Sequence, residues 1–388
     1  KANFRISAGY AGQEGSIIGQ HLDRFTTRVA LDYFISDRIK VVTNFNLTYT
    51  INKQNAGSLL SDALNRMPNL SVYYQDAQGR NLDEYYEVLS NASQDIPKNS
   101  NPVAVAYAAK QHSKNLDMQP EFQLVYNILS LDGTGHRLTY DGRITFGVSN
   151  SSSDSYRPSS LSSNGWTDDN ANKVSTSSSK NASITTTHSL TFTPHLNNSN
   201  HSLMAMIRGQ LSESNGKNMG TDIHGLPTGT FESTALPGII SGMNTGASKS
   251  RSVNGTFTAH YSYRGKYMAD VTVRADGNTK FGDKRRWGVF PSVSAGWVIS
   301  DEPWFNNDKV VNYLKLRGSY GQLGNERIGD EFPYMALLST GTSYLANTNG
   351  TMDLAQRASQ SDYAFEDISW ETTTSYDLGV DLTMLDSR

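Results

Sequence analysis

Residues 254–275 read NGTFTAHYSYRGKYMADVTVRA, and this stretch decides the fold. Every second residue of 257–263 is apolar or aromatic, and the residues between them are polar. After the three residues 264–266 the alternation resumes and continues through 267–275. A side-chain period of two is typical of a β-strand whose two faces meet different surroundings. The stretch therefore predicts two antiparallel strands joined by a tight turn.

Ten further segments alternate in the same way. The twelve predicted strands are 3–10, 24–35, 39–50, 121–129, 138–149, 182–192, 203–211, 254–263, 267–275, 289–299, 314–323 and 374–384. The first nine connections between these strands alternate between long and short. Outer-membrane barrels of bacteria have short periplasmic turns and long extracellular loops, and their tilted strands need roughly 9–11 residues to cross the membrane. We therefore predict an all-β fold, a transmembrane antiparallel up-and-down β-barrel whose first strand runs outward.

This orientation assigns the long connections to the cell exterior. The expected extracellular loops are 11–23, 51–120, 150–181, 212–253, 276–288 and 324–373. The apolar face of each strand would meet lipid, and the polar face, which carries charges of both signs such as Arg143 and Asp141, would line the barrel interior. Aromatic residues near the strand ends would form girdles at the membrane interface. The girdle prediction comprises Tyr49, Tyr261, Tyr263, Tyr267, Trp297, Tyr313 and Tyr376.

Composition excludes several other classes of protein. The 388 residues include 20 Tyr, 14 Phe and 5 Trp, too many for a charge-driven disordered chain. The apolar runs are too short for a membrane-spanning helix. A net charge of −3 without a basic stripe argues against nucleic-acid binding. With no Cys, the sequence excludes disulfides, thiolate metal sites and cysteine catalysis.

Five motifs carry a family resemblance. They are RFTTRVALDY at 24–33, VRADGNTKFG at 273–282, RWGVFPSVSAGW at 286–297, LKLRGSYGQLGN at 314–325 and SWETTTSYDLGVDL at 369–382. In their order and spacing they resemble the barrel strands of SusC/RagA-type TonB-dependent outer-membrane transporters. The resemblance covers nearly the whole chain.

The resemblance implies more than the residues themselves show. By this resemblance, the complete protein would be a barrel of about 22 strands, filled by an N-terminal plug that follows a TonB-binding box. Neither plug nor TonB box is recognisable here, so we expect residues 1–388 to be an internal barrel segment of about 12 strands. A self-contained twelve-stranded barrel is the alternative. The implied location is the cell outer membrane of a Gram-negative, Bacteroidetes-like bacterium.

The same resemblance implies the function. It predicts TonB-dependent import of a nutrient such as an oligosaccharide or peptide, with a SusD-like surface lipoprotein as lid and TonB acting through a segment outside this chain. Outer-membrane lipid would surround the barrel. A passive porin-like channel and a soluble β-rich protein that binds or cleaves glycans are the alternatives.

Motifs for chemistry are weak. The sequence lacks HExxH, GxSxG and phosphate-binding glycine loops, so we expect no catalysis, no cofactor and no metal, although acidic loop clusters leave Ca²⁺ open. Aromatic residues of the loops are the candidate ligand contacts, because such rings stack on sugar or peptide groups. They could equally pack the loops on themselves. The candidates are Tyr73, Tyr74, Tyr85, Tyr86 and Trp166.

Overall fold

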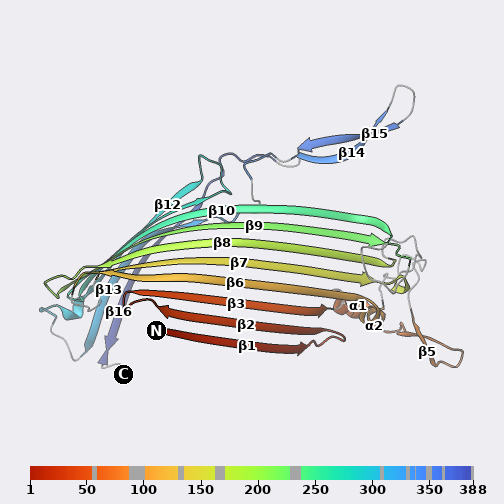
Figure 1. The fold of residues 1–388 in the computed structure, drawn as a ribbon, viewed down its shortest axis with the longest axis horizontal. Coiled ribbons are helices and arrows are strands. Elements are labelled where there is room, and N and C mark those ends of the chain that lie inside the picture. The colour runs from red at the N-terminus through yellow and green to blue at the C-terminus, as the bar shows by residue number, and fades with distance from the viewer. Residues whose placement is uncertain are drawn as a thin grey trace.

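A computed structural model describes most of the chain. The described residues are 1–54, 59–86, 101–129, 135–161, 171–227, 237–305, 310–328, 333–336, 338–346, 352–360 and 363–385. They form one twelve-stranded antiparallel sheet and two small two-stranded ribbons (Figure 1). None of the described helices is long and apolar enough to cross a membrane.

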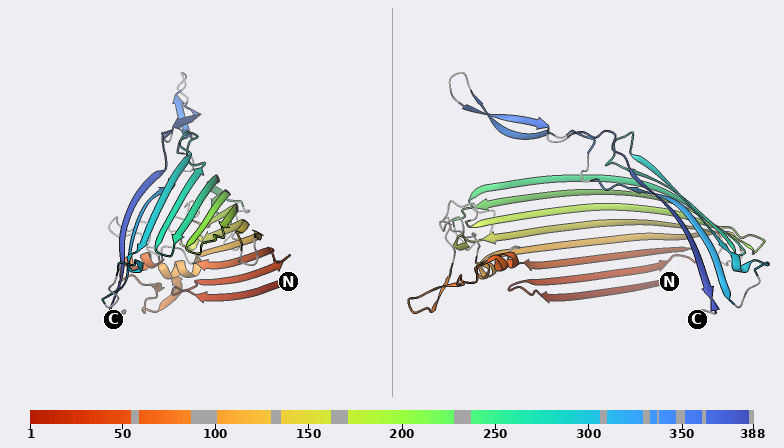
Figure 2. Two further views of the ribbon diagram at one scale, coloured as in Figure 1. Left: turned by 90° about the vertical axis from the view of Figure 1, so that its left-hand side faces the viewer. Right: turned by 180° about the vertical axis from the view of Figure 1, so that it is seen from behind.

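The large sheet follows the chain from one edge to the other. Its strands, in spatial order, are β1 (Ala2–Glu14), β2 (His21–Phe34), β3 (Ile39–Gln54), β6 (Lys110–Leu129), β7 (Arg137–Arg157), β8 (Lys173–Thr193), β9 (His201–His224), β10 (Ile239–Tyr263), β11 (Tyr267–Asn278), β12 (Trp287–Val298), β13 (Val311–Asn325) and β16 (Glu371–Met384). Each of the twelve predicted strands falls on one of them. The sheet curves into an arch whose edges are β1 and β16 (Figure 2), so the predicted up-and-down architecture is confirmed.

The two ends of the sheet differ. One end, here called the short-turn end, carries the connections 35–38, 130–136, 194–200, 264–266 and 299–310. The opposite end, the long-connection end, carries 15–20, 55–109, 158–172, 225–238, 279–286 and 326–370. The tightest turn, 264–266, is built on two left-handed residues, Arg264 at φ 53° and Gly265 at φ 69°. Such residues fit the right-handed twist of a two-strand hairpin.

The strands are longer than the sequence predicted, and the loop boundaries at 51–120, 150–181 and 212–253 are therefore wrong. β6 begins at Lys110, β7 continues to Arg157, and the β9–β10 pair continues to His224 and Ile239. The added segments are rich in Ser, Thr, Asn and Gly, so they lack the apolar alternation on which the prediction depended. The backbone ladder continues through these mostly polar segments, with a register shift between Ile240 and Gly242, and a buried cluster of Tyr156, Val174, Ile223 and Leu226 packs near its end.

Register divides the sheet into two faces. On one face Val271 is opposite Ala259 and Val293, and Phe257 is opposite Ile207. We call this the apolar face. On the other, the polar face, Thr272 is opposite Thr258 and Ser292, consistent with the alternation of side chains along a strand.

The long connections contain structure of their own. The connection 55–109 holds α1 (Leu59–Asn65), α2 (Pro102–Ala108) and the ribbon β4–β5 (Tyr73–Gln75, Asn81–Tyr85). Their buried core is Leu59, Ala104, Val105 and, from the η1 turn (Ser159–Leu161), Leu161. The connection 326–370 holds the ribbon β14–β15 (Leu338–Ala346, Met352–Gln360), which projects away from the sheet in Figure 1. A last short turn, η3 (Ile299–Asp301), follows β12.

Candidate functional site

The polar face carries paired charges along the whole sheet. Lys40 Nζ lies 3.1 Å from Asp32 Oδ2, and Arg143 Nη1 lies 3.8 Å from Glu121 Oε2. Gln123 Nε2 donates to Asp141 Oδ2 at 2.6 Å. Because cations and anions alternate across neighbouring strands, the polar face presents hydrogen-bonding groups of both signs with little net charge.

A cavity of about 300 Å³ lies on the polar face of β10–β16. His260 Nδ1 lies 2.5 Å from Asp270 Oδ1, and Ser294 Oγ donates to Asp270 Oδ2 at 3.0 Å. Lys315 and Arg317 line the same cavity. Here the serine binds the carboxylate rather than the imidazole, so the arrangement positions charges and does not activate a nucleophile.

A second, larger cavity of about 470 Å³ lies on the polar face close to the long-connection end. Arg274 Nε donates to both carboxylate oxygens of Asp276, at 2.7 and 2.9 Å. The amides of Gln210 and Asn254, register partners on the polar face, line the same space. Amides, a guanidinium and carboxylates offer both donors and acceptors, which suits a polar ligand with hydroxyl or amide groups. We call this cavity the upper pocket.

Aromatic rings close one side of the upper pocket. The Trp370 ring lies 4.8 Å from that of Phe281 and 5.6 Å from that of Phe290, measured between centroids. Trp370 Nε1 donates to the backbone oxygen of Arg286 at 3.1 Å, and Phe281 is fully buried. These three rings therefore fix the connections 279–286 and 326–370 against the sheet. None of the three was predicted as a site residue from the sequence, although all three lie within the motifs that carry the family resemblance.

The predicted loop aromatics pack mainly on one another. Tyr73 stacks on Tyr85 with centroids 5.2 Å apart, and Tyr74 meets Tyr86 edge-on at 5.0 Å. Burial raises the pKa of Tyr85, and the nearby Tyr73 hydroxyl adds to the effect. This geometry fits the self-packing alternative for the four tyrosines, and their contact with a ligand stays a prediction. Trp166 lies outside the described residues.

Buried Asn101 holds this ribbon against α2. Its Oδ1 accepts from the backbone N–H groups of Val103 and Ala104, at 3.2 and 3.4 Å, which caps the helix. Its Nδ2 donates to the backbone oxygens of Val72 and Tyr86, at 2.7 and 3.0 Å. One side chain therefore joins the helix to both strands of the ribbon.

Six of the seven predicted girdle residues lie on the apolar face. Tyr263, Tyr267 and Trp297 stack in series at the short-turn end, with centroids 6.2 and 6.4 Å apart, and Tyr261 lies near the same end. Tyr313 also lies near this end, but it shares the alternation of Lys315 and Arg317 and so belongs to the polar face. Tyr49, opposite Phe25, and Tyr376, whose ring lies 5.2 Å from that of Tyr320, lie toward the other end. The two rows fit membrane interfaces in their placement, and that role stays a prediction.

Glu302 anchors the row at the short-turn end. Tyr267 Oη donates to its carboxylate at 2.6 Å and Trp297 Nε1 at 3.0 Å, while Lys266 Nζ lies 3.5 Å away. These contacts lower the pKa of Glu302, the Tyr267 hydrogen bond having the largest effect. The two rings are thereby fixed in orientation with their polar atoms turned toward the turn.

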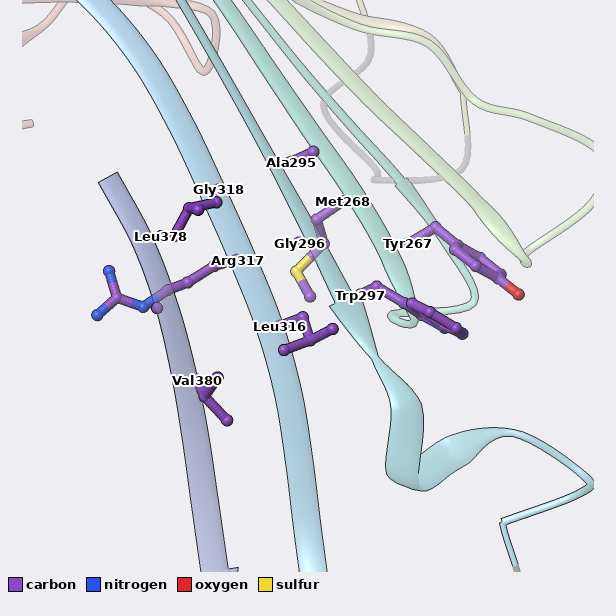
Figure 3. Close-up of a pocket in the computed structure, with 11 residues that line it drawn as sticks. Tyr267, Met268, Ala295, Gly296, Trp297, Leu316, Arg317, Gly318, Leu378 and Val380 are labelled. Atoms are coloured by element: carbon purple, nitrogen blue, oxygen red, sulfur yellow. The ribbon is translucent and has the colours of Figure 1, made fainter. Parts of the chain in front are cut away.

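A groove of about 720 Å³ extends from this row across β12, β13 and β16. Figure 3 shows the rings of Tyr267 and Trp297 at one end of it and Leu378 and Val380 toward the other. Register partners Ala295 and Gly318 lie between them, and their small size makes the floor shallow. The apolar lining fits the environment of a lipid chain rather than that of a polar nutrient.

Over the part of the chain that the structure describes, no group of three or more His, Asp or Glu side chains is placed to hold a metal ion.

Comparison with known proteins supplies the class. No family model matches the sequence. TonB-dependent receptor SusC of Bacteroides thetaiotaomicron is 34% identical over 129 residues, which is 33% of this chain and 13% of that protein. TonB-dependent receptor P39 of Formosa agariphila is 38% identical over 128 residues, 33% of this chain and 12% of that protein. TonB-dependent receptor P3 of the same organism is 23% identical over 402 residues, covering all of this chain and 37% of that protein.

Solved structures show the same fold. A structure of the RagAB peptide transporter matches the whole chain with a TM-score of 0.71 at 18% identity, over 41% of its own length. The RagAB peptide importer in its open-open state gives 0.72 at 19% identity, also over 41%. The chain thus spans well under half the length of these relatives.

Fold and matches together define a β-barrel protein of the bacterial outer membrane. Within that class the chain is similar to TonB-dependent receptors of the SusC/RagA type, and the resemblance seen in its sequence motifs is confirmed.

Proposed function

We propose that this protein takes part in TonB-dependent import of a nutrient, such as an oligosaccharide or a peptide, across the outer membrane. The single observation that carries the proposal is the upper pocket on the polar face, which combines amides, an Arg274–Asp276 pair and the Phe290 and Trp370 rings. In a barrel that face lines the path through the membrane. The names of the relatives, TonB-dependent receptor SusC and RagAB peptide transporter, support import as the activity.

The pocket's chemistry supports a polar, extended substrate. Hydroxyl or peptide groups would bind the amides of Gln210 and Asn254, and an apolar ring face would stack on Trp370. A strongly charged substrate fits less well, because Arg274 is already neutralised by Asp276. We infer that a SusD-like lipoprotein delivers the substrate to the long-connection end, where a lid would lie above this pocket.

Uptake by whole cells tests the proposal. In a strain that carries the full-length protein, Asn254→Ala with Gln210→Ala should reduce uptake of the nutrient on which growth depends. The same substitution at Asn150, which lies on the apolar face, is the matched control. A protonophore should abolish the uptake, because TonB depends on the energised inner membrane.

Each alternative function predicts a different result. A passive porin-like channel would continue to transport after the protonophore is added. A soluble glycan-cleaving protein would release products from glycan without any membrane. Either result would refute the proposal.

A further inference from the structure

Four cationic side chains lie in the alternation of the apolar face on β8–β10. They occupy the part of that face between its last apolar residues and the long-connection end. They are Lys180, Lys217, Lys249 and Arg251, and together we call them the basic belt. All four are exposed. Lys180 is the register partner of Lys217, whose partner on β10 is Ala247. Lys249 lies two residues from Ala247 on the same face, and Arg251 lies four residues from it. Over these three described strands, Glu213 is the one acidic residue in the same alternation.

The basic belt begins where the apolar part ends. On β10 the apolar face runs from Tyr263 to Val253, about 33 Å of strand at roughly 3.3 Å per residue. With a strand tilt of about 40°, this corresponds to about 25 Å of height, the thickness of the apolar band of an outer-membrane barrel. Arg251 is the next residue on that face, so it lies at the edge of the hydrocarbon region on the long-connection side.

The charge of the belt is only partly balanced. Glu213 binds Arg251 Nε at 2.7 Å and Lys249 Nζ at 3.3 Å. Lys180 and Lys217 have no carboxylate within ion-pair distance among the described residues, although they are direct cross-strand partners. Like charges in that position destabilise a sheet, and an anion between them would remove the penalty.

We propose that the basic belt binds the phosphate of a phosphorylated lipid in the outer leaflet of the outer membrane. A lipid phosphate carries negative charge and several acceptor oxygens at the height at which the belt lies, and its acyl chains would cover the apolar residues below. Lys180 and Lys217 would bind the phosphate from two strands, with Lys249 diagonally across from Lys217. Arg251, held by Glu213, lies four residues nearer the apolar part of β10. The proposal rests on the orientation that places the long connections outside the cell.

Lipid retention measures this site directly. The full-length protein would be reconstituted in phosphatidylethanolamine vesicles that contain lipid A, extracted in mild detergent and examined by native mass spectrometry. Lys180→Gln with Lys217→Gln should weaken retention of lipid A about 30-fold, because each lysine near an anionic lipid surface contributes about fivefold in affinity. The matched control is Lys173→Gln with Lys284→Gln, which removes the same charge outside the belt.

Three further outcomes decide the proposal. Equal loss in the belt and control variants would overturn it. So would equal retention of enzymatically dephosphorylated lipid A by the unmodified protein, a comparison that holds even if the double variant fails to fold. Displacement of lipid A by inorganic phosphate alone would assign the belt to a soluble anion and overturn the lipid assignment. Nutrient uptake measured on the same variants is expected to persist, so failure here is distinct from failure of the import proposal.

Discussion

Replacing Val271 by arginine should destabilise the barrel far more than the same change at the adjacent Thr272. Val271 lies on the apolar face, four residues from Tyr267 and six from Gly277, whose register partner is Trp287. These separations are about 13 and 20 Å along the strand, so Val271 lies near the middle of the apolar band.

The magnitude follows from that position. Arginine on the lipid face near the membrane midplane costs about 2–4 kcal/mol. The ratio of folded to unfolded protein should therefore fall about 30- to 900-fold. Thr272 faces the polar side, where its hydroxyl lies 3.3 Å from that of Thr258, so an arginine there loses one partly buried hydrogen bond and keeps its hydration. We expect a cost below about 1 kcal/mol at Thr272.

Urea titration of the full-length protein in lipid vesicles measures both costs. Stability alone does not separate a membrane barrel from a soluble sandwich, because Val271 would be buried in either. Since this chain has no Cys, Val271→Cys and Thr272→Cys can each carry one fluorophore within it. Brominated lipid should quench the label at 271 and leave the label at 272 unchanged. Quenching of both sites by water-soluble quenchers only would refute the membrane assignment of the apolar face.

Three other predictions test the turns and loops. The pKa of Glu302 is lowered, chiefly by its hydrogen bond from Tyr267, so its contacts stabilise the fold at pH values above the ordinary pKa of 4.5. This stabilisation is lost as the pH falls through the lowered pKa. Glu302→Gln should therefore remove that pH dependence from thermal unfolding curves. Asn101→Ala should lower the local free energy of unfolding by about 2–4 kcal/mol, because the helix cap is lost and two backbone carbonyls lose their donor. Hydrogen exchange of residues 59–86 should then be faster in this variant than in a Gln78→Ala control. Lys284→Cys should react with an impermeant maleimide on intact cells, and Asp37→Cys only after permeabilisation; the reverse pattern would invert the orientation.

The large sheet could be predicted from the sequence because membrane strands must separate their two faces. Alternation from 254 to 275 gave the hairpin, its tight turn and the direction of both strands, and the structure confirms the register. The polar ends of β7 and β8 could not be found in this way, since Ser151–Ser155 and Ser175–Ser179 have no apolar partner face. Their pairing continues the ladder set by the apolar parts of β7 and β8, and the local sequence of the polar ends does not encode it.

The candidate site was harder to predict than the fold. The upper pocket joins residues from β9, β10, β11 and β13 with Trp370, which is close in space and distant in sequence. Only the register between strands brings them together. By contrast, the tyrosines of the 55–109 connection stood out in the sequence because they occur in adjacent pairs, yet their rings satisfy one another within the ribbon.

The polar upper parts of β7–β10 have a consequence for how such proteins can vary. Those parts have little apolar–polar alternation, so their own residues specify the strand register weakly. The register is set by the membrane-embedded part of the same strands. An insertion of one residue at Ala182 would turn every side chain above it to the opposite face, moving Lys180 away from Lys217. An insertion of two residues would preserve the faces and lengthen the wall. Viable length changes within these strands are therefore expected in even steps.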